Sequence, residues 1–376
     1  LLDDFLPAVE FPAPSPNPMN HLTRPSFLQI TPSRFYPIDV SHRPTFPGVR
    51  RVLMLLFLVF LSGGVVTGKE TLYLASGDGR DIVAALQSLP EEGGAVVLGP
   101  VLFPVSEAIV IDRDGVELRG ISEETTLRLT DHANCSVIVI GTTNTPVDQI
   151  VKGISVRNLV IDGNRGAQDF ECTGGPCDGG GLAYIRNNGI TIRGAEDITI
   201  DHIITHNARS GGIVLEKHCR RVVISNFESY NNEFDGLAAY ESEDCTFTQM
   251  KLHNNRSAAL SVDWKFNRNT ISDSLFVENG AQGIFMRDAV ENDFINVYIR
   301  DNGEQGIFIA ETREIADSSA RDNRFDRLLV SGNRTQGIRV NDLSCVGNVI
   351  TRSKVLNNKQ EDISVAGEGL LRELTE

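Results

Sequence analysis

The dominant pattern in the chain is a short apolar segment that returns about every 23 residues. Each segment opens on a two-residue pair that ends in Ile or Leu, and successive pairs are spaced by 23, 24, 23, 24, 23, 31 and 25 residues. Short segments rich in β-branched and aromatic residues, separated by Asn or Gly, predict β-strands. A unit of this length cannot bury its own apolar face, so the units are expected to stack. The opening pairs are Gly189-Ile190, Gly212-Ile213, Gly236-Leu237, Ala259-Leu260, Gly283-Ile284, Gly306-Ile307, Gly337-Ile338 and Asp362-Ile363.

Two further columns keep a fixed offset from these pairs. Asparagine tolerates the left-handed backbone of tight turns, and its amide can bond to the same residue in the next unit. We therefore predict two turns per coil, each carrying a ladder of stacked side chains. The column four residues before the pair is Asn232, Asn255, Asn279, Asn302, Asn333 and Asn358. The column ten residues earlier is Val222, Cys245, Asn269, Asn292, Asn323 and Asn348.

The absence of proline from the repeats supports the same architecture. No proline follows Pro176, as expected when each central strand must donate its backbone N–H groups to the next coil. Connections between parallel strands are right-handed almost without exception. The predicted fold is all-β, a single-stranded right-handed parallel β-helix over residues 69–376. One amphipathic helix at about 81–89 is expected to cap its N-terminal end, because an open solenoid end invites edge pairing.

With its Gly-Ile strands and Asn turns, the chain resembles the β-helix repeat proteins of the pectate-lyase-like superfamily, over about residues 71–365. That superfamily includes polysaccharide lyases, glycosidases and alginate epimerases. The resemblance implies a right-handed parallel β-helix that acts on a polysaccharide, with the cleft on the strand that carries the Gly-Ile pair. The reaction itself has to be argued from the site, because fold does not imply function.

The first 68 residues have a different composition. Ten of the 15 prolines lie between Pro7 and Pro47, which predicts that residues 1–48 are a disordered leader or a gene-start artefact. Residues 49–68 hold two arginines, the apolar run 52–61 and a small-residue end, the pattern of a secretory signal. A short buried or interfacial helix is the alternative. The signal reading predicts export, to the medium, periplasm or cell surface, without stable membrane insertion after signal removal.

The charge balance restricts the partners. Fifty acidic and 35 basic side chains give a net charge of -15. A chain this acidic binds polyanions poorly, so no nucleic-acid partner is expected and a bare polyuronate is disfavoured. Cys172 and Cys177 could close a small disulfide loop, whereas no cysteine or histidine spacing fits a metal site. No metal ligands or cofactor are therefore predicted, with Ca2+ left open, and the sequence does not address the oligomeric state.

The candidate site lies on the strand that follows each pair. If the first and third residues after the Gly position face the core, the fourth faces out and the fifth begins a turn. Members of one column lie one coil apart, about 5 Å. The outward row reads Arg193, Glu216, Tyr240, Asp263 and Arg287. We predict Glu216, Asp235, Tyr240, Asp263 and Arg287 as catalytic residues and Lys217, Trp264, Lys265 and Asp288 as substrate-binding residues. An exposed aromatic ring beside carboxylates and an arginine suits a pyranose.

Three functions remain open for this row. Elimination or C5 epimerisation of a uronate needs a cation and a proton-transfer group, which Arg287, Lys217, Lys265 and Tyr240 could supply. However, the Asp-Pro-His of alginate epimerases is missing from the matching coil, 212–216. Hydrolysis needs two carboxyl groups, and Asp235 stands where polygalacturonases, which the segment 232–236 resembles, carry an acid; their Asp-Asp and Gly-His-Gly are absent. The third function is non-catalytic glycan binding by a surface solenoid.

Two other features could compete with this row. An outward column before the Asn turn reads His206, Tyr230, His253, Val277 and Arg300, with His202 nearby. Its histidines could act as a base or bind a metal, although surface or core positions are the simpler interpretation. Insertions after Asn164 and after Gly306 interrupt the period. Loops at such breaks often carry function, so either insertion could form the wall of a groove.

Overall fold

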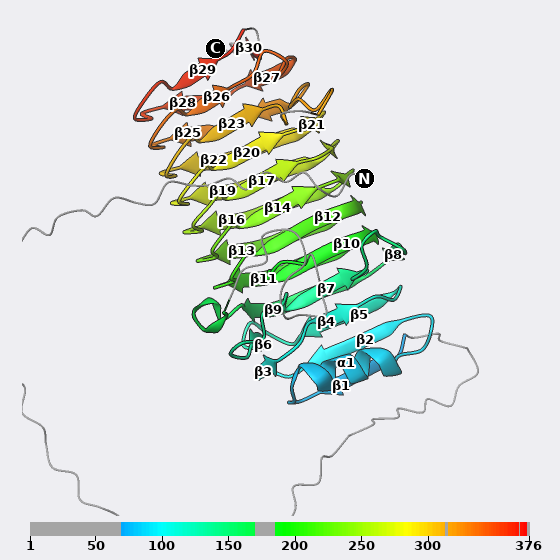
Figure 1. The fold of residues 1–376 in the computed structure, drawn as a ribbon. Helices are drawn as coiled ribbons and strands as arrows, with labels where there is room; N and C mark the ends of the chain where they lie inside the picture. Colours follow the sequence, from blue (N-terminus) through cyan, green and yellow to red (C-terminus); the bar gives the residue numbers. More distant parts are fainter. Residues whose placement is uncertain (1–68, 170–184, 313–314, 368, 374–376) are drawn as a thin grey trace, which may run out of the picture. The chain divides into compact units, whose positions relative to one another are not determined.

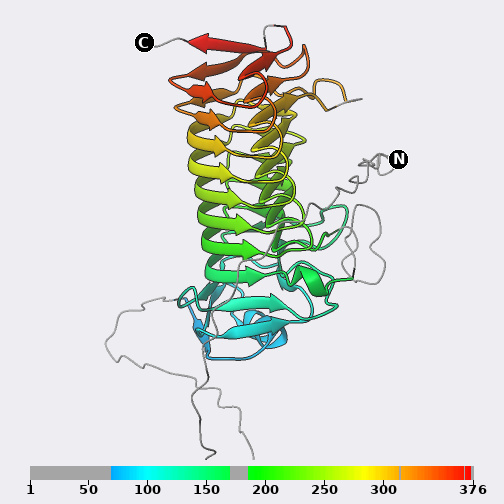
Figure 2. The same cartoon turned by 90° about the vertical axis from the view of Figure 1, so that its left-hand side faces the viewer.

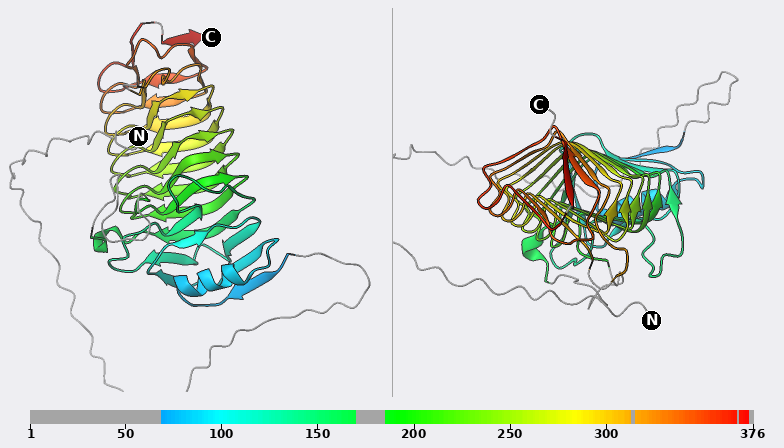
Figure 3. Two further views of the ribbon diagram at one scale, coloured as in Figure 1. Left: turned by 45° about the vertical axis from the view of Figure 1, so that its right-hand side comes forward. Right: turned by 90° about the horizontal axis from the view of Figure 1, so that it is seen from above.

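The computed structural model describes residues 69–169, 185–312, 315–367 and 369–373. The leader, the signal-like segment and the proposed Cys172–Cys177 disulfide lie outside these residues. The described chain winds into a parallel β-solenoid, with the coils stacked one above the next (Figures 1 and 2). Seen from above, successive coils lie over one another (Figure 3). The predicted all-β right-handed parallel β-helix is confirmed, and it is longer than the eight coils that the Gly-Ile pairs mark.

The described strands form two sheets in which every pairing between strands is parallel. The 16-stranded sheet, here sheet A, follows the order β1 (Thr71–Leu74), β2 (Gly94–Leu98), β5 (Val116–Gly120), β9 (Ser155–Asp162), β11 (Thr199–His206), β13 (Val223–Tyr230), β16 (Thr246–His253), β19 (Thr270–Val277), β22 (Asp293–Arg300), β24 (Arg324–Asp326), β27 (Asn348–Thr351) and β30 (Leu370–Glu373), with β3 (Leu102–Val105), β6 (Thr126–Leu129), β25 (Leu329–Ser331) and β28 (Lys354–Leu356) beside it. The 14-stranded sheet, sheet B, follows the order β21 (Ala289–Val290), β18 (Phe266–Asn267), β15 (Ser242–Glu243), β12 (Ile213–Arg220), β14 (Leu237–Tyr240), β17 (Leu260–Asp263), β20 (Ile284–Arg287), β23 (Ile307–Ala310), β26 (Ile338–Val340) and β29 (Ile363–Val365), with β4 (Ile109–Ile111), β7 (Ile138–Gly141), β8 (Val151–Lys152) and β10 (Ile190–Glu196) beside it.

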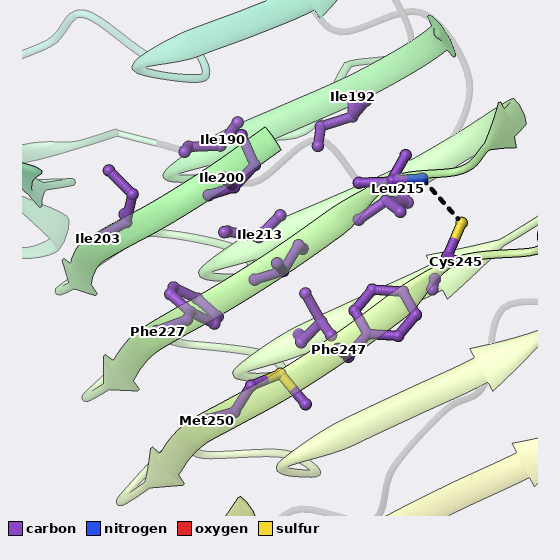
Figure 4. Close-up of a cluster of buried hydrophobic side chains, with 14 of the residues drawn as sticks. Ile190, Ile192, Ile200, Ile203, Ile213, Leu215, Phe227, Cys245, Phe247 and Met250 are labelled. Carbon is purple, nitrogen blue, oxygen red and sulfur yellow. Dashed lines mark hydrogen bonds between the residues drawn. The ribbon is translucent and has the colours of Figure 1, made fainter. Parts of the chain in front are cut away.

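The core lies between the two sheets. In sheet B the first and third residues after the Gly position are buried from β10 to β26, as Ile213 and Leu215 show in β12, and partly buried in β29. They meet aromatic side chains of sheet A such as Phe227 and Phe247 (Figure 4). The aromatic positions also stack between coils, with the Phe294 and Phe325 rings 5.0 Å apart. The register that the sequence predicts is therefore the register of the core.

Both predicted ladders are present at the turns. In the first, each Asn amide from Asn232 to Asn333 donates to the side-chain oxygen of the next coil's asparagine, at 2.9–3.0 Å. That oxygen also accepts the backbone N–H of the preceding coil's asparagine. In the second, Asn269, Asn292, Asn323 and Asn348 repeat the arrangement. Cys245 extends it, because its Sγ accepts the backbone N–H of Val222. These bonds satisfy polar groups that the turns bury.

The N-terminal end carries the expected helix, displaced from the predicted position. Helix α1 spans Gly79–Ser88, whereas the sequence predicted about 81–89. Its start is set by Asp78, whose carboxylate accepts the backbone N–H groups of Arg80 and Asp81 in a capping box. Its buried residues include Ile82 and Leu86, which join the core beneath it. A short 3-10 helix, η1 (Arg165–Ala167), begins the first insertion.

Candidate functional site

The outward row on sheet B has the predicted register. Arg193 pairs with Glu216 in adjacent strands, and Tyr240 pairs with Asp263 in the next two. Arg287 follows on β20, opposite Ala310 of β23. The row therefore runs along the solenoid axis, one residue per coil.

Glu216 is the partly exposed carboxyl group of the row. Its side chain is 22% exposed, and its Oε1 lies 3.2 Å from Nε of Arg193. Burial raises the pKa of Glu216, while Arg193, Lys217 and Arg186 act against that rise and Glu241 adds to it. The carboxyl group is thus held in a low-dielectric setting beside several cations, an environment typical of catalytic carboxyls.

Tyr240 and Asp235 lie together at the centre of the site. Tyr240 hydrogen-bonds Ser261, and burial followed by the charge of Asp235 raises its pKa. Asp235 is 9% exposed and accepts the backbone N–H of Ala258 at 2.9 Å. Burial also raises the pKa of Asp235, and Arg186 counteracts this effect. Since Arg186 acts on Glu216, Asp235 and Tyr240 alike, it is a common neighbour of all three.

Asp263 is enclosed rather than open to solvent. Its side chain is 3% exposed. One carboxylate oxygen accepts Thr312 Oγ1 at 2.7 Å and the Trp264 backbone N–H at 2.8 Å, and the other pairs with Arg287. Arg287 itself is 36% exposed and lies 5.1 Å over the Phe285 ring. Asp263 is therefore placed to hold Arg287, and the guanidinium of Arg287 is the group that a ligand can reach.

The four predicted substrate-binding residues directly follow the row, Lys217 within β12 and the other three in the turns after β17 and β20. All four adopt left-handed φ angles, from 37° at Asp288 to 62° at Lys265. The Lys217 ammonium lies 5.7 Å over the Trp264 ring, and the Trp264 and Tyr240 rings are 6.3 Å apart. The Lys265 backbone N–H donates a hydrogen bond of 3.0 Å to Asp288 Oδ2. The structure brings Lys217 and Trp264 next to the row, with Lys265 beside Trp264 in the same coil and Asp288 one coil further along.

The competing histidine column forms a stack on sheet A. The rings of His206, Tyr230 and His253 follow one another at 5.2 and 5.1 Å. Because the tyrosine ring separates the two histidines, they cannot share a metal ion. His253 Nε2 instead bonds Glu228 at 2.9 Å, and His202 bonds the neighbouring Asp201. These contacts favour a stacked surface column over a catalytic base.

The described part of the chain holds no cluster of typical metal ligands and no membrane-spanning helix. Among those residues no group of three or more His, Cys, Asp or Glu side chains is placed to hold an ion, including the Ca2+ considered above. No helix found there is long and apolar enough to cross a bilayer. The cysteines at 135, 219, 245 and 345 are free, and burial raises the pKa of Cys245 to about 12.

Comparison with protein families decides where this solenoid belongs. The family model described as the right handed beta helix region matches residues 154–291 and 265–374. The chain belongs to the right-handed β-helix family. The matched residues include the whole of the row from Arg193 to Arg287. No curated protein sequence matches this β-helix protein.

Several solved structures share its fold. The A-module of mannuronan C-5 epimerase AlgE4 from Azotobacter vinelandii aligns with a TM-score of 0.53 at 15% identity, over 80% of this chain and 96% of that one. ORF18 of Geobacillus virus E2 aligns with 0.53 at 12% identity, over 76% and 56%. The N-terminal fragment of bacteriophage Phi29 gene product 12 aligns with 0.52 at 16% identity, over 78% and 56%. At these identities the likeness concerns the fold.

Three members of the site were not found from the sequence. Arg186 and Thr312 lie within the two insertions, where the repeat gives no orientation. Ser261 occupies the second position after the Gly column, on the same face as the row, but a serine there carried no distinct chemical signal. The insertions were identified as breaks in the period, and that signal would have been sufficient to propose that their first and last residues reach the row.

Proposed function

We propose that this β-helix protein is a carbohydrate-active enzyme that hydrolyses a polysaccharide bound on the outer face of sheet B. The observation that carries the proposal is the pair of carboxyl groups Asp235 and Glu216, which share Arg186 as a neighbour but differ in their surroundings. A carboxyl pair with contrasting environments is the usual basis for an acid and a base in glycoside cleavage.

The surroundings assign the two roles. Asp235 is the more deeply buried of the two groups, and burial raises its pKa against the opposing effect of Arg186, so we assign it the role of general acid on the leaving oxygen. Glu216 faces Arg193, Lys217 and Arg186, which oppose the rise that burial causes in its pKa, so we assign it the role of the group that activates water or attacks the sugar. Tyr240 stays protonated and donates a hydrogen bond, while Trp264 and Arg287 contact the ring and its hydroxyls.

The charge balance of the row favours a neutral glycan. Arg193 lies beside Glu216, and Arg287 pairs with Asp263. Lys217 Nζ lies 3.8 Å from Glu241 Oε1. A polyuronate would bring one carboxylate per sugar, and these cations are already compensated. The same balance argues against uronate elimination, as does the raised pKa of Tyr240, because a protonated phenol cannot abstract a C5 proton.

Export of the protein is part of the proposal. It rests on the sequence of residues 49–68, a basic pair followed by an apolar run and small residues. A polysaccharide substrate is consistent with that destination. The mature N-terminus of secreted material is expected near Lys69, and a mature start well before it would contradict export by this segment.

The test is a screen of neutral and uronate polysaccharides with purified protein. Reducing-end assays are expected to detect hydrolysis of a neutral glycan, and Glu216→Gln and Asp235→Asn are each expected to lower the rate by about 100-fold or more. Exposed Glu291→Gln is the matched control and should keep full activity. An unsaturated product absorbing near 230 nm would show that the reaction is elimination and not hydrolysis. Glycan binding without cleavage by the unmodified protein would instead favour a binding solenoid.

A further inference from the structure

Arg193 is the largest fully buried side chain among the described residues, at 1% exposure. It stands on β10 at the N-terminal end of the outward row. Arginine is rarely buried to this extent, because removing its charge from water is costly and apolar residues of similar size would serve the core as well. A burial so complete calls for a role other than packing.

A dedicated loop holds this guanidinium in place. Residues 142–149, between β7 and β8, supply the Thr145 hydroxyl and the Asn144 carbonyl, which accept from Arg193 Nη2 at 2.7 and 3.3 Å. The loop is itself fastened by Asp148, which accepts the Thr142 hydroxyl and the Asn144 amide, both at 2.5 Å. One side of the guanidinium is therefore fixed by a closed set of hydrogen bonds.

Two glycines allow the loop to approach this closely. Gly141 and Gly194 have φ angles of 99° and 56°. A Cβ at Gly141 would lie 1.8 Å from the carbonyl oxygen of Arg193, and a Cβ at Gly194 would lie 2.6 Å from the carbonyl oxygen of Gln149. Any other residue at these positions would displace the loop from Arg193. The backbone is thus built around the buried arginine.

The other side of the guanidinium is turned to Glu216. Nε lies 3.2 Å from Glu216 Oε1 without the alignment of a hydrogen bond, and Nη1 is buried with no hydrogen-bond partner among the described residues. Other charged groups that face Glu216 are Lys217 on its own strand, Arg186 from the first insertion and Glu241 from the turn of the next coil. Lys217 on β12 and Arg193 on β10 both lie on strands. Because Lys217 is 40% exposed, Arg193 is the rigid and desolvated cation of these two.

We propose that Arg193 is a positioning residue that favours the charged form of the Glu216 carboxyl group and directs it at the substrate. The inference rests on the proposed function, since it gives Glu216 its charge for the reaction. The loop 142–149 fixes the cation, and the cation in turn fixes the carboxylate. Arg193 does not touch the sugar itself.

The first test measures the ionisation of Glu216 without any substrate. Infrared titration of the protein resolves a carboxyl band that Glu216→Gln removes, and this band reports on Glu216 alone. In Arg193→Met the band is expected to persist to higher pH, and Arg193→Lys is expected to restore most of the change. Arg220→Met, which removes an exposed arginine from the end of β12, is the matched control. An unchanged titration in Arg193→Met would overturn the proposal.

The second test uses the hydrolysis of the glycan found in the screen. Arg193→Met is expected to lower kcat about 10- to 100-fold with little change in KM, and to move the acidic limb of the pH–rate profile to higher pH. A lower kcat with an unchanged acidic limb of the pH–rate profile would show that Arg193 has only a structural role and would contradict the proposal. If Glu216→Gln keeps full activity, the proposed function fails, whereas the infrared result still decides whether Arg193 controls Glu216.

A milder variant covers the case in which Arg193→Met does not fold. Thr145→Val removes the 2.7 Å hydrogen bond to Nη2 and leaves the arginine in place. It is expected to shift the Glu216 band in the same direction by a smaller amount. Circular dichroism and the thermal midpoint establish that the variant is folded. A folded Thr145→Val protein with an unchanged Glu216 band and unchanged pH–rate profile would contradict the role of the loop.

Discussion

Thr312 donates a hydrogen bond of 2.7 Å to Asp263, which stands 49 residues earlier in the chain and two coils away. The contact fastens the second insertion across the outward row. It also accounts for the enclosure of Asp263, because the remaining oxygen of that carboxylate is taken by Arg287. The second insertion, which lies outside the repeat, thus completes the hydrogen bonding of Asp263 within the repeat.

Removing this hydroxyl should loosen the insertion. Thr312→Val keeps the side-chain shape and leaves one buried carboxylate bond unmade, so we expect a loss of about 1–2 kcal/mol in the free energy of unfolding. Chemical denaturation measures the loss, and limited proteolysis should cut within 311–319 sooner than in the unmodified protein. Ser344→Ala, which removes a bond to Glu311 at the same loop, provides a comparison. Unchanged proteolysis in Thr312→Val would show that the bond does not hold the loop.

The asparagine ladder should be sensitive in its middle. Asn279 donates to Asn302 and accepts from Asn255, so Asn279→Ala leaves buried polar groups unpaired on both sides. We expect a destabilisation of about 2–4 kcal/mol, read from the urea midpoint. Asn341→Ala, which removes part-buried bonds to Arg339 and Asp342 outside the ladder, should cost less than about 1 kcal/mol. Equal effects at both positions would contradict a structural ladder.

The glycine column should tolerate a methyl group poorly. A Cβ at Gly283 would lie 2.2 Å from Ile299 Cγ2 and 2.7 Å from the carbonyl oxygen of Gly306. Gly283→Ala is therefore expected to cost about 1–3 kcal/mol through overpacking. Gly166 has no atom within 4 Å of its Cβ position, so Gly166→Ala is the matched control and should leave the thermal midpoint within about 2 °C. A neutral Gly283→Ala would show that the coils can move apart.

Stability should depend on pH through Asp235. Burial raises its pKa in the folded state, so the folded protein binds the proton more tightly than the unfolded chain. The stability that this group contributes is complete below the ordinary pKa of aspartate, about 3.9, and is lost as pH rises through the folded value. The free energy of unfolding of Asp235→Asn, taken relative to that of the unmodified protein, should therefore be higher at pH 8 than at pH 4. Asp317→Asn, an exposed control, should show no such trend.

The contribution of His206 to stability should depend on pH in the opposite direction. Burial lowers its pKa, with Arg128 adding to the effect and Asp162 opposing it. The unfolded chain then takes up the proton first as pH falls below about 6.5, and the fold loses stability there. His206→Phe keeps a ring in the stack and removes the titration, so its stability should fall less between pH 7 and 5. The same change at His218, whose side chain is 70% exposed, should leave that slope unaltered.

The repeat explains why most of the fold and the register of the row could be predicted from the sequence. Columns such as Asn232 to Asn358 follow from a fixed offset, and a fixed offset is what parallel in-register pairing requires. The same offset placed Glu216, Tyr240 and Asp263 on one outward line. Helix α1 starts two residues before the predicted position because its start depends on one capping side chain, Asp78, rather than on a period.

The surroundings of the row could not be predicted in the same way. Whether Asp263 is open or enclosed depends on Thr312, and the environment of Asp235 depends on Arg186. Both partners come from insertions, whose path is set by tertiary contacts and has no repeating pattern. The sequence therefore identifies which side chains face outward, while their ionisation and accessibility require the structure.

The ladders restrict how this protein can change its length. In the repeat region, backbone bonds and asparagine amide bonds join each coil to its neighbours, so a change of a few residues within a strand there would move the asparagines out of register. A whole coil of 23 or 24 residues can be added or removed with all columns kept in register. The outer face of sheet B can therefore lengthen or shorten only in whole steps of about 4.8 Å, so under the proposed function the number of coils would set the length of glycan that the face accommodates.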